Sequence, residues 1–150
     1  MVLMEDVRVP KANLVGKQGQ GFSIALAGLD GGRLNIASCS IGGAAKCLDI
    51  AKKYTMTRKQ FGQPLSNFQH TQFKLANMAT DLEASRLMVR HGARLLSEKS
   101  ENYTMYCSMA KKFATDKCFD ITNHALQLHG GYGYLKEYPI ERYLRDLRVH

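Results

Sequence analysis

Apolar residues recur at helical intervals over most of this chain. From about Asn67 to Glu98 they alternate at steps of four and three residues, with Arg86 as the one polar exception. The repeating positions are Leu75, Ala79, Leu82, Val89, Ala93 and Leu96. Because this spacing places one apolar stripe along a single helix face, it predicts a helix packed within a bundle.

Three further segments have helical patterns. The first runs from Phe22 to about Lys53, another from about Asn102 to His129, and a short one begins near Pro139, a favourable first position of a helix. The Asn102–His129 segment places five apolar residues on one side: Ala110, Phe113, Ile121, Ala125 and Leu128. Three long helices and a truncated fourth, joined by short links, predict an all-α fold, an antiparallel four-helix bundle over residues 16–150.

The first predicted helix is unusually rich in glycine. Its glycines are Gly28, Gly31, Gly32, Gly42 and Gly43. In a helix interior each glycine costs roughly 1 kcal/mol relative to alanine. So many glycines in one helix therefore indicate close approach by a neighbouring helix or by a ligand.

The N-terminal residues have a different pattern. Residues 2–10 alternate loosely and predict a lone strand, which has no sheet to join within this chain. We therefore interpret residues 1–15 as a short extended arm, the tail of a preceding β-domain. The following stretch, Asn13 to Gly21, predicts a glycine-rich turn; no G-K-[ST] follows it, which argues against a phosphate-binding loop.

Composition narrows the functional classes. The net charge of +8 attracts anions, but the lysines and arginines are scattered, which is typical of a solvated helical surface. A basic module that binds nucleic acid or an acidic protein remains the alternative, without a clustered basic face to support it.

The four cysteines form no C-x-x-C pair, and no histidine has metal-ligand spacing, so we expect no metal site. No apolar run approaches the ~20 residues of a membrane span.

The stretch from Ala125 to Tyr134, ALQLHGGYGY, contains the first candidate binding residues. An apolar helical run ends there in adjacent glycines followed by aromatic residues. Glycine ends helices in left-handed turns, and it also lets a ligand approach the backbone. Gln127 lies about one turn before Gly130 and offers an amide to a polar ligand. A plain helix cap with a tyrosine-lined turn is the alternative.

Two other stretches carry charged or polar candidates. In the connection RKQFGQPLS, Arg58 suits a grip on phosphate, and Phe61 would anchor the loop or cover an aromatic ligand. Gln69 follows at the start of the next helix, where polar ligand groups are favoured. In LDGGRLNI, Asp30 and Arg33 would bind a substrate or form a surface ion pair. For Arg58 and Phe61 the alternative is a surface arginine and a buried loop phenylalanine.

Taken together, these stretches resemble the C-terminal region of the acyl-CoA dehydrogenase family. The segment RKQFGQPLSNFQHTQFKLANMATDLEASRLM, followed by ALQLHGGYGY, carries the resemblance, and the opening EDVRVPKANLVGKQGQGF looks like the passage out of the family's middle β-domain. LDGGRLNIASCSIGGAA and QLHGGYGYLKEYPIERYLRD are most similar to the branch that acts on isobutyryl-CoA in valine breakdown. The resemblance covers essentially all 150 residues.

The resemblance implies a cofactor, FAD, bound across subunits of a dimer or tetramer. Arg58 would grip the FAD pyrophosphate of a neighbouring subunit. The other implied cofactor contacts are Phe61, Phe68, Gln69, Gln127, Leu128, His129, Gly130 and Gly131. Asp30, Gly31, Gly32 and Arg33 would lie against the acyl-CoA substrate. Electrons would leave to an electron-transfer flavoprotein, and the mitochondrial matrix is the implied location.

The chain departs from the family at the catalytic base. In most members a glutamate in an E-G-[TS] motif follows a segment that corresponds here to Arg145–His150, where this sequence stops. A minority of members place the glutamate just before the arginine of the first bundle helix, and here that position is Gly32. We therefore expect the isolated chain to be inactive, with no catalytic residue of its own. A bundle that serves only oligomerisation is the rival interpretation.

Overall fold

The computed structural model describes all residues, 1–150, and is dominated by helices. A 3-10 helix, η1 (Lys11–Asn13), precedes the long helix α1 (Gly21–Thr57). A hairpin of β1 (Lys59–Gln60) and β2 (Gln63–Pro64) and the 3-10 helix η2 (Leu65–Asn67) lead into α2 (Gln69–Ser97). Then follow α3 (Tyr103–His129), the 3-10 helix η3 (Gly130–Tyr134) and α4 (Ile140–Arg148). The predicted all-α fold and the four helices are confirmed; the small hairpin was not expected.

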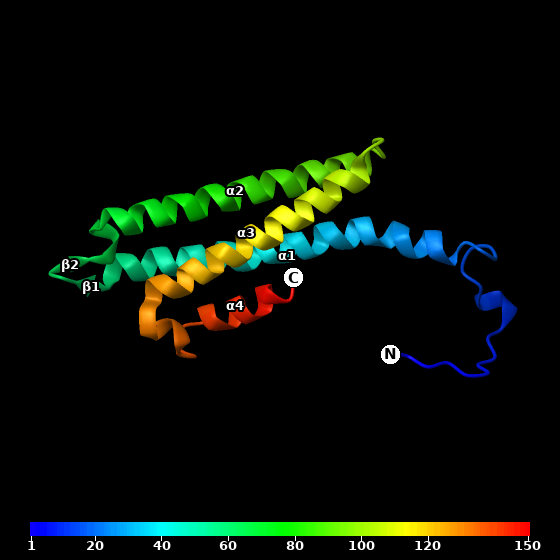
Figure 1. Ribbon diagram of the computed structural model, residues 1–150, viewed down its shortest axis with the longest axis horizontal. Coiled ribbons are helices and arrows are strands. Elements are labelled where there is room, and N and C mark those ends of the chain that lie inside the picture. The colour runs from blue at the N-terminus through cyan, green and yellow to red at the C-terminus, as the bar shows by residue number, and fades with distance from the viewer.

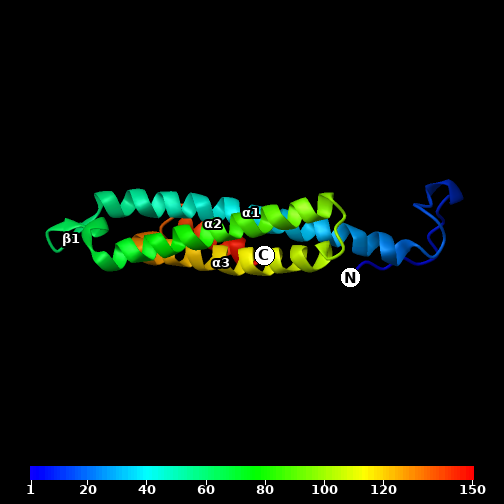
Figure 2. The ribbon, with the colours of Figure 1, turned by 90° about the horizontal axis from the view of Figure 1, so that it is seen from above.

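Consecutive helices run antiparallel, as predicted (Figure 1). The long helices α1, α2 and α3 lie side by side and make an elongated body (Figure 2). The most extensive interface joins α1 to α3, and the short α4 packs on these two helices on the side away from α2 (Figure 1). Because α1 and α3 run in the same direction, their C-terminal ends lie at the same end of the molecule.

The close α1–α3 contact follows from small side chains. The buried residues of α1 between its two ends include Ala37, Ser40, Ala44, Cys47 and Ala51. Most of those of α3 are equally small, among them Cys107, Ala110, Ala114, Cys118 and Ala125. Short side chains let two helix backbones approach closely. The close packing of α1 on α3 thereby fixes the hairpin after α1 relative to the turn after α3.

Along α2 the predicted stripe is only half correct. Leu75, Leu82, Val89 and Leu96 do face the core, but Ala79 and Ala93 are exposed. The alternate positions of the buried stripe are one residue earlier: Thr71, Met78, Ser85 and Gly92. Ser85 and Gly92 fill core positions without being apolar, so the apolar pattern alone placed half of the buried stripe one residue too late. Arg86 is half-exposed and lies outside the buried stripe, so it is not a polar exception within it.

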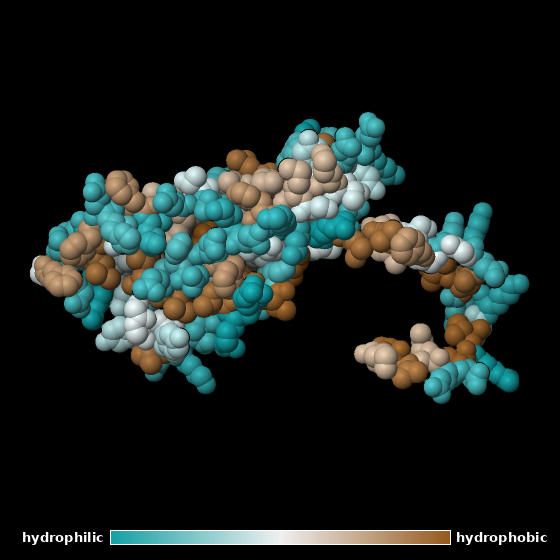
Figure 3. Space-filling view, in the orientation of Figure 1, coloured by the Kyte–Doolittle hydropathy of each residue, from teal (hydrophilic) through white to brown (hydrophobic).

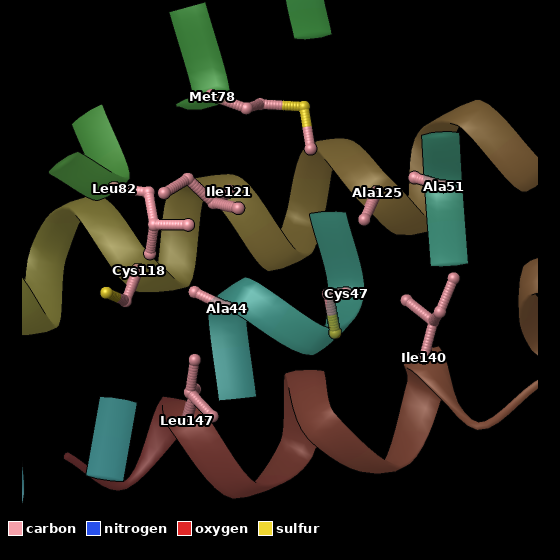
Figure 4. Close-up of a cluster of buried hydrophobic side chains, with 10 residues drawn as sticks. All are labelled: Ala44, Cys47, Ala51, Met78, Leu82, Cys118, Ile121, Ala125, Ile140 and Leu147. Carbon is pink, nitrogen blue, oxygen red and sulfur yellow. The ribbon is translucent and has the colours of Figure 1, made fainter. Parts of the chain in front are cut away.

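The end of the bundle near the hairpin has a core built by all four helices (Figure 4). Met78 and Leu82 of α2 and Ile140 and Leu147 of α4 close it over the small residues of α1 and α3. The α1 residue Gly43 admits α4, because a Cβ at this position would lie 2.6 Å from Leu147 Cδ1. The predicted close approach is thus confirmed at Gly43. Helix α4 begins at Ile140, with Pro139 as its cap rather than its first residue.

The N-terminal part projects from the bundle. Residues 1–29 are all exposed, and the predicted strand over residues 2–10 is absent, because no second strand lies beside it to share hydrogen bonds. Apolar side chains therefore stand open on the arm and on the first turns of α1, among them Phe22, Leu26 and Leu29 (Figure 3). None of the helices combines the length and the apolar character needed to cross a membrane.

Candidate functional site

The hairpin that follows α1 holds Arg58 at the end of the bundle. The Arg58 N–H donates to Tyr54 O at 2.8 Å, and its carbonyl accepts the Leu65 N–H at 2.9 Å, so its backbone is fixed on both sides. Between the strands, Phe61 (φ +52°) and Gly62 (φ +80°) form the two-residue loop. Left-handed conformations at both loop positions match the right-handed twist of a hairpin, but they are strained for phenylalanine.

The segment after α3 forms the opposite wall. Gly130 has φ +56°, a conformation that glycine adopts without strain, and it turns the chain from α3 into η3. Gly133 is packed against α3, since a Cβ there would lie 2.8 Å from Leu126 O. A Cβ on Gly131 would meet no atom, so this part of the turn stays open. Such a turn leaves its backbone accessible to a ligand.

Between these two walls lies a groove of about 450 Å³. It is lined by Tyr54, Arg58, Gln60, Leu65, Gln127, Leu128, His129, Gly130, Gly131, Tyr132 and Leu135. The structure thus brings together six of the nine residues that the sequence analysis assigned to a cofactor, from stretches about 70 positions apart. These stretches lie together because α1 and α3 are parallel neighbours whose C-terminal ends are adjacent.

The three remaining candidates lie around the hairpin, outside the groove lining. Phe61 is 91% exposed, so the alternative of a buried loop phenylalanine is wrong. Its ring stands edge-on to Phe68, with centroids 6.3 Å apart, and Phe68 is half-buried at the entry to α2. Gln69 is exposed in the first turn of that helix.

Aromatic rings surround the base of the groove. The His129 imidazole stacks on Tyr54 with ring centroids 4.0 Å apart, and Tyr138 meets both rings edge-on. His129 Nδ1 donates to Ala125 O at 2.8 Å, while its buried Nε2 has no hydrogen-bond partner. Burial lowers the pKa of His129, although the Ala125 carbonyl opposes this, and burial raises the pKa of Tyr54. The histidine is accordingly neutral in its Nδ1–H form.

The substrate candidates lie far from this groove. Asp30 is buried; one of its carboxylate oxygens pairs with Arg33 and the other accepts the Thr104 hydroxyl at 3.0 Å. The predicted i, i+3 ion pair is therefore present, but its carboxylate is buried rather than on the helix surface. A Cβ on Gly31 or Gly32 would meet no atom, so the chain's own packing does not require glycine there. A helical rise of about 1.5 Å per residue puts roughly 40 Å between Asp30 and Arg58.

Sequence reasoning missed several groove residues. Tyr54 lies one helical turn before Arg58, and that spacing was the available signal for it. Tyr132 belongs to the aromatic turn after the glycines, which was noted without a role. Gln60, Leu65 and Leu135 had no signal, because only the folded hairpin and turn place them in the groove.

Comparisons with known proteins identify the family to which the chain belongs. Residues 19–150 match the family described as "Acyl-CoA dehydrogenase, C-terminal domain". The chain is 58% identical to the mitochondrial isobutyryl-CoA dehydrogenase of Dictyostelium discoideum over 99% of its own length, and it spans 36% of that relative.

Solved structures give the same result. The chain matches the butyryl-CoA dehydrogenase of Megasphaera elsdenii with a TM-score of 0.92 and 40% identity, over 98% of this chain and 38% of that one. It also matches an acyl-CoA dehydrogenase of Bacillus anthracis, solved in complex with FAD, with a TM-score of 0.90 and 33% identity over 98% of this chain and 28% of that one. The chain belongs to the acyl-CoA dehydrogenase family and contains its C-terminal helical domain.

Proposed function

We propose that this chain is the FAD- and acyl-CoA-binding C-terminal part of a flavoprotein acyl-CoA dehydrogenase. The reaction is the α,β-desaturation of a short branched acyl-CoA, isobutyryl-CoA, in valine breakdown within the mitochondrial matrix. The observation that carries the proposal is the groove, in which Arg58 faces the exposed glycine turn that follows α3. The relatives described above support the substrate class and the location.

The groove fits the phosphate part of FAD. Arg58 takes part in none of the chain's seven ion pairs, so its charge is not already neutralised by a carboxylate. Gln127 is exposed at the end of α3 and offers its amide, and the open backbone at Gly130 and Gly131 admits close contact. A planar guanidinium suits bidentate binding of phosphate oxygens. FAD, when bound, supplies the acceptor for the hydride that leaves the substrate β-carbon.

The acyl-CoA would lie at the other end of α1. Gly31 and Gly32 leave an open face beside the Asp30–Arg33 pair, where a ligand can approach the helix. This face lies roughly 40 Å from Arg58. Such a distance favours an arrangement in which the face and Arg58 contribute to two different active sites of an oligomer. A homo-oligomer, dimer or tetramer, would then bring the Arg58 groove of one subunit to the flavin of its neighbour, with an electron-transfer flavoprotein as electron acceptor.

The base that removes the substrate α-proton is not among these residues. None of the chain's glutamates is followed by Gly-Thr or Gly-Ser, and Gly32 occupies the alternative position. We therefore expect the isolated 150-residue chain to have no dehydrogenase activity. It should also bind FAD at most weakly, because it offers only the neighbouring subunit's half of the cofactor site.

A chimera tests the proposal. These residues would replace the matching segment of the Dictyostelium discoideum relative, and FAD would be titrated into the apoprotein. A hydrogen bond to a charged group contributes about 1.5–3 kcal/mol, so Arg58→Ala should weaken FAD binding roughly ten- to a hundredfold. Arg58→Lys should recover only part, because an ammonium lacks the planar fork. Lys59→Ala, which removes the adjacent exposed charge, is the control. Equal FAD affinities of Arg58→Ala and the unmodified chimera would refute the assignment of the groove.

A bundle that serves only assembly is the second candidate. The observation in its favour is the exposed apolar surface of Phe22, Leu26 and Leu29 on the first turns of α1. This function predicts a chimera that assembles normally and binds FAD with an affinity independent of every groove residue. The same titrations therefore separate the two functions.

A further inference from the structure

We propose that Tyr132 is a positioning residue for Arg58. Its ring holds the guanidinium at the groove, where the charge is available to an anionic ligand. This inference rests on the proposed function, because the anion is taken to be the FAD pyrophosphate.

The first observation is how Arg58 is held. Its backbone is fixed by the hydrogen bonds to Tyr54 and Leu65, but a fixed backbone does not fix a long side chain. The guanidinium carbon lies over the Tyr132 ring, 5.2 Å from its centroid, within the range of a cation–π contact. No hydrogen bond of the Arg58 side chain competes with this contact, so the ring is what defines the position of the charge.

The second observation is that the Tyr132 ring itself packs against a further ring, that of Tyr138. Its centroid lies 5.6 Å from that of Tyr138, and Tyr138 lies edge-on to Tyr54 at 5.9 Å. The backbone carbonyl of Tyr54 accepts the Arg58 N–H. Together with the ring contacts, this hydrogen bond forms a closed circuit, Arg58–Tyr132–Tyr138–Tyr54–Arg58. The circuit joins the end of α1, the turn η3 and the segment before α4. Gly133, packed against Leu126, anchors the turn that carries Tyr132.

A ring serves this purpose better than a carboxylate would. Some of the other arginines are instead held by acidic side chains, as Arg33 is by Asp30 and Arg145 is by Glu141. Such a partner neutralises the cation and occupies the N–H groups that would bind a phosphate. An aromatic face leaves the formal charge in place and engages the flat side of the guanidinium rather than its N–H edges. Restricting the side chain before binding also reduces the entropy lost when the ligand arrives.

The experiment is a double-mutant cycle in the chimera described above, with FAD affinity as the readout. Tyr132→Leu should weaken FAD binding roughly two- to tenfold, from the strength of cation–π contacts at partly exposed positions. Tyr132→Phe keeps the ring and should bind FAD like the unmodified chimera. Tyr134→Leu is the matched control, since Tyr134 lies in the same turn, is 82% exposed and should not change the affinity.

The cycle is completed in the Arg58→Ala background. If Tyr132 acts through Arg58, adding Tyr132→Leu there should cause no further loss of FAD affinity. The inference is overturned if Tyr132→Leu binds FAD normally, or if it causes the same loss with and without Arg58. If Arg58→Ala itself leaves FAD affinity unchanged, the proposed function of the groove fails together with this inference. If Arg58→Ala weakens binding and Tyr132→Leu does not, only this inference fails.

Discussion

The imidazole of His129 lies almost parallel to the ring of Tyr54, with an angle of 22° between the two planes. His129 ends α3 and Tyr54 lies in the last turn of α1, so this stack joins the two helices at the base of the groove. The imidazole donates one N–H to Ala125 O, and its Nε2 is enclosed without a partner. A second proton on this ring would place a buried N–H where no acceptor exists.

The isolated chain should therefore lose stability as the pH falls below 6.5, the ordinary pKa of histidine. Burial lowers the pKa of His129 in the folded state, so the unfolded state binds protons first and is favoured at lower pH. This contribution is fully present above the unfolded pKa and is lost below it. Urea unfolding of the chain at pH 7.5 to 5, in steps of about half a unit, would show the decline.

Replacement of His129 should make this pH dependence shallower. His129→Phe keeps a ring against Tyr54 and cannot be protonated, although it loses the bond to Ala125. Burial also lowers the pKa of His124, so His124→Gln is needed as a second variant to separate the two contributions. An undiminished slope in His129→Phe would show that this histidine does not set the acid sensitivity.

Two neighbouring glycines in α1 should respond oppositely to alanine. A Cβ on Gly42 meets no atom, so Gly42→Ala should stabilise the chain by about 0.5–1 kcal/mol through helix propensity. A Cβ on Gly43 lies 2.6 Å from the buried Leu147 and must displace it. Overpacking of a core costs about 1–3 kcal/mol, so we expect Gly43→Ala to be less stable than Gly42→Ala by about that amount. Urea unfolding of the pair measures the difference, and equal stabilities would contradict the observed closeness of α4.

Much of this fold could be predicted because a long helix repeats its apolar spacing over many turns. The buried stripe of α2 was misplaced where core positions are not apolar: Ser85 and Gly92 are buried, while Ala79 and Ala93 are not. The hairpin was missed because its strands have two residues each, too few for any alternation to be visible. Even where periodicity identifies the inner face of a helix, it does not say which helices lie side by side.

The same limit applies to the site. Local motifs singled out Arg58 and the glycines after His129, because loop arginines and helix-ending glycines are informative by themselves. The groove that joins them depends on the close packing of α1 on α3, which small residues spread over both helices create. Tyr132 was visible in the sequence, but its contact with Arg58 exists only after that packing has formed.

Chemical modification should find one reactive thiol in the native chain. Cys39 is exposed, whereas Cys47, Cys107 and Cys118 are buried. Burial raises the pKa of Cys47 to about 11 and of Cys118 to about 12, and it raises that of Cys107 as well, so little thiolate is present at pH 8. Titration with a chromogenic disulfide should count one thiol, none in Cys39→Ser, and all four in denaturant. Fast reaction of a second native thiol would show that the helices open more readily than this packing allows.

The last prediction concerns Phe61, whose conformation and exposure are both unfavourable. A left-handed conformation costs a non-glycine residue about 1–2 kcal/mol, and asparagine tolerates it better. The edge-on contact with Phe68 opposes this cost, but at 91% exposure of Phe61 it should contribute only the low end of the usual range, about 0.5 kcal/mol. Phe61→Asn should therefore stabilise the isolated chain by roughly 0.5–1 kcal/mol in urea unfolding.

Strained backbone conformations cluster at ligand-binding sites. A residue that lowers the stability of the fold is therefore expected where it contacts a ligand. In the chimera, Phe61→Asn should therefore weaken FAD binding while the fold becomes more stable. Phe61→Leu is the matched variant: it keeps the strained conformation, loses the ring, and should lower both stability and FAD affinity. If Phe61→Asn proves less stable than the unmodified chain, the contact with Phe68 outweighs the backbone strain at the hairpin. If instead it is more stable and binds FAD normally, Phe61 has no part in holding the cofactor.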